Sequence, residues 1–176
     1  MIRVVVADDH PIVRSGIVGL LGSADDIEVV GEASDGAEAV ALATQLSPDV
    51  VLMDLRMPGL GGAEATALLV AARPDVRVLI LTTYESDENI LTAIEAGASG
   101  YLLKAAPQDE ILAGLRSVAR GEVALAPSIA ALLVTRMRED ASHPRVRETR
   151  RERPHSCRHE GNGAGVASAL ARDCVV

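Results

Sequence analysis

The chain has 176 residues, 48% hydrophobic and 24% charged, which suits one globular domain with an added segment. Aromatic residues make up only 1%, which argues against a nucleic-acid platform that stacks bases on rings. Charge is uneven: residues 1–141 carry 21 acidic and 10 basic side chains, whereas residues 142–176 carry 4 and 7. No apolar run approaches the ~20 residues of a membrane span and the first residues lack a signal-peptide layout, so we expect a cytoplasmic protein without membrane contact.

Five short apolar segments predict β-strands. They are rich in Val, Ile and Leu, which is typical of parallel strands buried on both faces of a sheet. The predicted strands are residues 4–7, 27–30, 50–53, 76–81 and 100–103.

Longer segments between the strands have helical spacing. Pro11 suits the first turn of a helix, and Val13 and Ile17 continue the period. Further helices are predicted to begin near residues 36, 62, 86 and 107. Five strands alternating with five helices predict an α/β fold, a parallel sheet with helices on both faces.

Polar residues follow four of the predicted strands. In such a sheet the ligand site lies beyond the carboxyl ends of the strands, so we expect these side chains to converge. Any one of them alone is an ordinary loop or capping residue, but their joint placement is not, because the only lysine of the chain is among them. They are Asp8 and Asp9, Asp54, Thr82 and Lys104, after the first, third, fourth and fifth strands.

This set of side chains suits phosphoryl transfer. Adjacent carboxylates repel one another, and a hard divalent cation such as Mg²⁺ relieves that repulsion. A carboxylate beside the cation can act as a nucleophile and form an acyl phosphate. Lys104 could neutralise one phosphoryl oxygen, and the Thr82 hydroxyl could donate to another.

Residues 1–120 resemble the receiver domain of bacterial two-component response regulators. The resemblance rests on Ala7-Asp8-Asp9-His10, on Asp54 through Gly59, on Leu81-Thr82-Thr83, and on the segment from Ala96 to Lys104. The motifs Asp8-Asp9-His10-Pro11 and Leu102-Leu103-Lys104 are similar to those of the subfamily whose output is a LuxR/NarL-type helix-turn-helix. The resemblance implies a flavodoxin-like (βα)5 doubly wound sheet with strand order 2-1-3-4-5.

The resemblance also implies roles for individual residues. Asp54 would accept a phosphoryl group from a sensor histidine kinase, and the protein would form a homodimer on phosphorylation. The chain would not be an enzyme beyond slow self-dephosphorylation. The implied Mg²⁺ ligands are Asp8, Asp9, Asp54 and the backbone carbonyl of Arg56. The implied phosphoryl-binding and switch residues are Thr82, Thr83, Tyr101 and Lys104.

Other classes of site fit less well. A Mg²⁺-dependent phosphatase that uses an aspartyl phosphate usually has a second Asp two positions after the nucleophile, where this chain has Arg56. A nucleotide-binding loop would need its glycine motif after the first strand, where Asp8 and Asp9 stand instead. His10 is interpreted as a capping or surface residue rather than as a metal ligand.

The C-terminal third lacks the sequence pattern of the expected output domain. Residues 121–141 predict a linker helix, centred on the apolar pattern of residues 127–138. Between residues 143 and 165 the only aliphatic side chain larger than Ala is Val146, too little for the core of a helix-turn-helix. Residues 142–176 are therefore interpreted as a disordered or aberrant basic tail, produced by a frameshift or a truncation of the gene.

Alternatives for this tail stay open. It could be a natural disordered extension or a basic arm that attracts phosphate backbones weakly. A metal site at His155, Cys157 and His159 would lack the second paired cluster that finger-like zinc sites have. Two functions follow: a regulator of transcription that binds DNA only if an output domain is present, or a stand-alone receiver that acts by protein contact or as a phosphate sink.

Overall fold

A six-stranded parallel sheet forms the centre of the molecule. The computed structural model of the chain describes residues 1–83 and 87–142. The strand order is β2-β1-β3-β4-β5-β6, which confirms the predicted order 2-1-3-4-5 and adds one strand. The strands are β1 (Ile2–Ala7), β2 (Ile27–Ala33), β3 (Val50–Met53), β4 (Arg77–Thr82), β5 (Gly100–Leu103) and β6 (Ala124–Leu125).

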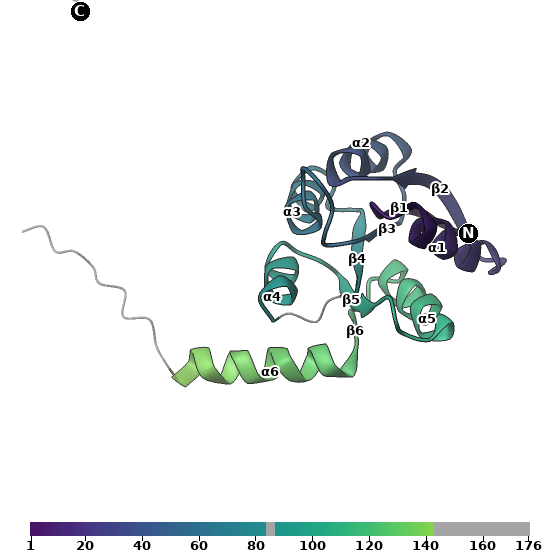
Figure 1. Cartoon of the computed structure of the whole chain (residues 1–176). Coiled ribbons are helices and arrows are strands. Elements are labelled where there is room, and N and C mark those ends of the chain that lie inside the picture. The colour runs from purple at the N-terminus through teal and green to yellow at the C-terminus, as the bar shows by residue number, and fades with distance from the viewer. Residues whose placement is uncertain (84–86, 143–176) are drawn as a thin grey trace, which may run out of the picture. The chain divides into compact units, whose positions relative to one another are not determined.

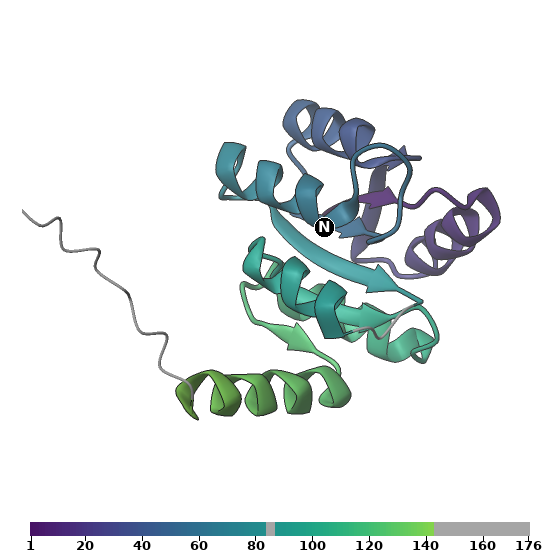
Figure 2. The same ribbon diagram turned by 60° about the vertical axis from the view of Figure 1, so that its left-hand side comes forward.

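Helices cover both faces of this sheet, as the predicted doubly wound fold requires. Figure 1 shows α1 and α5 on one face and α2, α3 and α4 on the other. The sixth helix lies at the β6 edge, where it contacts α4 (Figures 1 and 2). The helices are α1 (Pro11–Gly22), α2 (Gly36–Leu46), α3 (Gly62–Ala72), α4 (Asp87–Glu95), α5 (Gln108–Ala119) and α6 (Pro127–Ser142).

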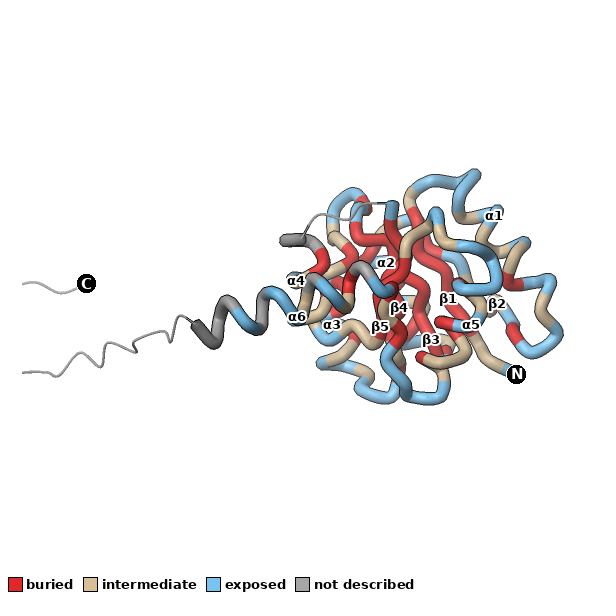
Figure 3. The backbone as a smooth tube through the Cα atoms, turned by 90° about the horizontal axis from the view of Figure 1, so that it is seen from below, coloured by how far each residue is buried: buried red, intermediate tan, exposed pale blue. Residues whose placement is uncertain are grey.

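The core is aliphatic. The central strands β1, β3 and β4 are buried along most of their length (Figure 3). Apart from Thr82, their buried side chains are Val, Leu, Ile, Ala and Met, as expected for a chain without Phe and Trp. Tyr101 is the largest fully buried side chain and lies on β5. The sheet is thus a rigid base whose carboxyl edge can hold polar residues in place.

The largest differences between the sheet and the prediction concern β6 and β2. β6 was not predicted, because its two residues are too few to show a periodic pattern; Ala124 and Leu125 pair with Gly100 and Tyr101. β2 continues to Ala33 instead of ending at residue 30. It is an edge strand, so it tolerates the exposed polar side chain of Glu32 that hid its length in the sequence.

Some predictions fall outside the described residues. They concern the tail from residue 143 onward, including the metal site weighed for His155, Cys157 and His159. Within residues 1–83 and 87–142, no helix is both long enough and apolar enough to cross a membrane.

Candidate functional site

The backbone of the sheet places the predicted polar residues side by side. Ala7 of β1 lies opposite Met53 of β3, so the next residues, Asp8 and Asp54, leave adjacent strands together. The Asp54 amide donates a hydrogen bond to the Ala7 carbonyl at 2.9 Å. The Lys104 amide donates to the Thr82 carbonyl at 2.8 Å. Hydrogen bonding between strands thus continues one residue beyond β3 and β5, and it fixes the backbone positions of Asp54 and Lys104.

Lys104 bridges two buried carboxylates. Its Nζ lies 2.6 Å from Asp8 Oδ2 and 3.0 Å from Asp54 Oδ2. The Asp8 and Asp54 residues are 1% and 5% exposed, and only 9% of the Lys104 side chain is exposed. The second oxygen of Asp54, Oδ1, accepts a hydrogen bond from the Leu55 amide at 2.8 Å. One ammonium group therefore faces two carboxylates where water has little access.

The Asp54 carboxyl has a raised pKa. Burial is the main cause, because it disfavours the charged form, and the neighbouring charge of Asp8 raises the pKa further. The hydrogen bond and charge of Lys104 act in the opposite direction but do not cancel the effect of burial. The ionised carboxylate is consequently less stable here than in water, which favours its combination with a cation or an electrophile.

Asp9 and His10 form the outer side of the cluster. The Asp9 side chain is 28% exposed, and its Oδ1 lies 2.7 Å from His10 Nδ1. His10 occupies the position before the first turn of α1, but its side chain makes no capping hydrogen bond. Its backbone amide instead donates to Asp8 Oδ1 at 2.9 Å. The side chain is exposed, as interpreted from the sequence, but it does not cap the helix.

The donor set fits a divalent cation. One ligand atom from each of Asp8, Asp9, His10 and Asp54 can be chosen so that all lie within 4.8 Å of one another. Apart from the ion pairs already described, Asp8 Oδ2 and Asp9 Oδ1 have no hydrogen-bond partner among the described residues. Carboxylate oxygens are ligands that Mg²⁺ prefers, so the cluster satisfies the chemical requirement of the predicted cofactor.

A cavity of about 240 Å³ opens over Asp9, His10 and Asp54, whereas Asp8 is not among its lining residues. Among the other predicted site residues, Arg56 and Thr83 border it, whereas Thr82 and Tyr101 are not among its lining residues and lie buried in β4 and β5. Val13 was not among the predicted site residues; its spacing in the sequence indicated only the helix that begins at Pro11. The cavity is lined by Asp9, His10, Val13, Asp54, Arg56, Thr83 and Lys104.

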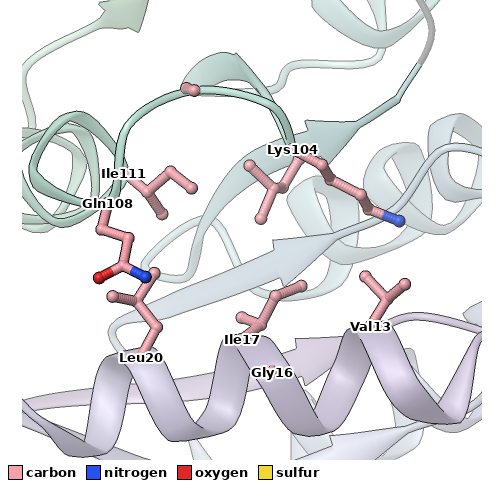
Figure 4. A pocket seen from close by; sticks show the side chains of 9 residues that line it. Val13, Gly16, Ile17, Leu20, Lys104, Gln108 and Ile111 are labelled. Carbon is pink, nitrogen blue, oxygen red and sulfur yellow. The ribbon is translucent and has the colours of Figure 1, made fainter.

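A second pocket of about 350 Å³ adjoins the first and shares Val13 and Lys104 with it. In Figure 4 the side chains of α1 face those of the segment that follows β5, and the Lys104 ammonium group points toward the Val13 end. Beside it Ile12 is 89% exposed and Val13 36% exposed. The approach to the Asp54 site is therefore partly apolar.

The chain is similar to known signalling proteins. The sequence profile of the response regulator receiver domain matches residues 4–116. The transcriptional regulatory protein LiaR of Bacillus subtilis is 43% identical over 154 residues, 86% of this chain and 73% of LiaR. The response regulator GacA of Pseudomonas aeruginosa is 41% identical over 81% of this chain and 67% of GacA. A LuxR-family response regulator from Aurantimonas sp. superposes with a TM-score of 0.73 at 37% identity, covering 78% of this chain and 98% of that structure.

Proposed function

The chain belongs to the response regulator receiver family, and from this membership we propose that Asp54 is the phosphoacceptor of a two-component signalling protein. One observation carries the proposal. Asp54 is a buried carboxylate at the carboxyl end of a central strand, 3.0 Å from the only lysine of the chain, and it lines the cavity of about 240 Å³. The donor proposed is the phosphohistidine of a sensor histidine kinase.

In the proposed reaction an Asp54 carboxylate oxygen attacks phosphorus. An O–P bond forms while the P–N bond to the donor histidine breaks, and the electron pair of that bond stays on the histidine nitrogen, which takes a proton. Lys104 lies beside Asp54 Oδ2 and neutralises charge on the transferred group. When bound, Mg²⁺ would be held by Asp8, Asp9, Asp54 and the Arg56 carbonyl, and would neutralise phosphoryl oxygens.

A route from the site to the rest of the molecule follows from the hydrogen bonds. We propose that the hydroxyls of Thr82 and Thr83 engage the phosphoryl group and that Tyr101 changes position in response. The Thr82 carbonyl accepts the Lys104 amide, so a movement of β4 is transmitted to the end of β5. The Tyr101 carbonyl accepts the Ala126 amide at 3.2 Å, at the start of α6. Phosphorylation would therefore alter the position of α6.

Control of transcription is the proposed output. LiaR is named as a transcriptional regulatory protein, and it is similar to this chain over 154 residues. We further propose that the protein works in the cytoplasm and forms a homodimer on phosphorylation. An electrophoretic mobility shift assay with promoter DNA tests whether this polypeptide itself binds DNA; without binding, the alternative of a receiver that acts by protein contact is supported.

The phosphoacceptor assignment is tested with acetyl phosphate and Mg²⁺. A Phos-tag gel should show a slower phosphorylated band for the parent protein and none for Asp54→Asn. Asp25→Asn is the matched control, because Asp25 is an exposed carboxylate that precedes β2, at the opposite edge of the sheet. If Asp54→Asn is labelled as strongly as the parent protein, the assignment is wrong.

A further inference from the structure

The imidazole of His10 lies within the carboxylate cluster, but the proposed phosphoryl transfer gives it no role. Its side chain is 67% exposed and makes no capping hydrogen bond at the start of α1. It is also not needed to support the core, because so much of it faces solvent. Its imidazole instead lies at ion-pair distance from Asp9, on the solvent side of the cluster.

The geometry brings the imidazole nitrogen into the ligand set. His10 Nδ1 lies 2.7 Å from Asp9 Oδ1 and 3.6 Å from Asp8 Oδ1. Adjacent ligands of an octahedral ion with bonds of about 2.1 Å are about 3 Å apart, and opposite ligands about 4.2 Å apart. The four ligand atoms lie up to 4.8 Å apart, which is slightly more than this. A single ion could contact His10 and the carboxylates after small side-chain adjustments.

Lys104 leaves this side of the cluster open. Its ammonium group contacts Oδ2 of Asp8 and Oδ2 of Asp54, whereas His10 lies nearest to Asp9 Oδ1 and approaches Asp8 Oδ1. Asp8 is almost completely buried, and within the described residues its Oδ2 has no partner besides Lys104. The single positive charge of Lys104 thus faces Asp8 and Asp54 from their Oδ2 side, and a divalent cation on the His10 side would add positive charge beside Asp9.

The chemical nature of the ligands determines which cation the site prefers. Carboxylates alone suit Mg²⁺, whereas an imidazole nitrogen favours the later first-row divalent metals over Mg²⁺. We propose that His10 Nδ1 is a direct metal ligand and that it shifts the preference of this site from Mg²⁺ toward first-row transition metal ions, with Co²⁺ as the probe. The inference rests on the proposed function, because it concerns the cation site beside the phosphoacceptor.

The test compares Co²⁺ and Mg²⁺ binding by isothermal titration calorimetry at one fixed pH. The full chain is used in a background with His143→Gln, His155→Gln, Cys157→Ser and His159→Gln, which leaves His10 as the only histidine. The further variant is His10→Gln. Its Mg²⁺ affinity should stay within about two-fold of that of the background protein. Its ratio of Co²⁺ to Mg²⁺ affinity should be lower than that of the background protein by about ten-fold or more.

A second readout is independent of affinity. In the same background, Co²⁺ should shift the ring resonances of His10 far outside their diamagnetic range, as direct coordination requires. An unchanged ratio of Co²⁺ to Mg²⁺ affinity in His10→Gln would overturn the inference, whether both affinities are retained or both fall equally. Failure of the parent protein to bind Mg²⁺ would instead count against the proposed function itself.

Discussion

Lys104 is the residue on which the charge balance of the site depends. It is nearly buried and lies within 3.0 Å of carboxylate oxygens of both Asp8 and Asp54. A buried charge that loses its partner is much more costly than an exposed one. Neutralising Lys104 therefore leaves two facing carboxylates without a cation, which destabilises the folded state.

We expect Lys104→Met to lower the free energy of unfolding by about 3 kcal/mol in the absence of Mg²⁺, because it leaves buried carboxylates unpaired. Urea denaturation followed by circular dichroism measures this change. Arg120→Met is the control, since it removes a positive charge from an exposed ion pair with Glu122. An equal loss of stability in both variants would contradict the account.

The raised pKa of Asp54 makes a prediction with a definite sign. Its folded-state pKa lies above the reference value of 3.8, mainly because of burial, so Asp54 favours folding when it is protonated. This contribution is present below pH 3.8 and is lost as the pH rises through the folded-state pKa. Asp54→Asn cannot ionise and escapes that loss.

The difference in unfolding free energy, Asp54→Asn minus parent, should therefore increase as the pH is raised from about 4 to about 7. Urea titrations with EDTA present measure it, because EDTA removes any bound cation. A difference that decreases with rising pH would show that Lys104 stabilises the carboxylate more than burial opposes it.

At the scale of elements, the turn between β3 and α3 fixes the backbone beside Asp54. The Gly62 amide donates to the Leu55 carbonyl at 3.0 Å. A Cβ atom at Gly62 would overlap the Asp54 carbonyl oxygen and lie 2.9 Å from Leu55 Cα. A Cβ atom at Gly61 would meet no atom closer than 3.7 Å. A Cβ atom can therefore be accommodated at Gly61 but not at Gly62 unless the backbone moves.

Gly62→Ala should lower the free energy of unfolding by about 2–3 kcal/mol and slow phosphate uptake, because the backbone next to Asp54 must move. Gly61→Ala is the matched control and should change both quantities little. Thermal denaturation and the acetyl phosphate assay measure the two effects. Equal effects at both positions would contradict the close approach of Gly62 to the Asp54 backbone.

The packing of α6 gives another prediction for an element. Ile129 is 2% exposed, whereas Val134 on the same helix is 48% exposed. Ile129→Ala should cost about 2–4 kcal/mol of unfolding free energy because it leaves a cavity. Val134→Ala should change it by no more than about 0.5 kcal/mol. If both variants unfold at the midpoint of the parent protein, α6 does not pack on the receiver fold.

For the whole molecule, the alternation of apolar strands and periodic helices was enough to predict the fold, because each buried strand is a continuous apolar run. Position in the chain also predicted that Asp8, Asp54 and Lys104 would meet, since parallel strands end at one edge of a sheet. The sequence could not show β6, which has two residues, nor the contact of His10 with Asp9. The strand β6 and the contact of His10 with Asp9 both depend on tertiary packing, which a local sequence pattern cannot predict.

The central claim is that Asp54 carries the phosphoryl group. Borohydride reduces an acyl phosphate to an alcohol and so converts the modified aspartate to homoserine, which peptide mass spectrometry can locate. After treatment with acetyl phosphate and Mg²⁺, the full chain should contain homoserine at position 54 and retain aspartate at positions 8 and 9. Homoserine at another position, or phosphate incorporation without any homoserine, would contradict the account.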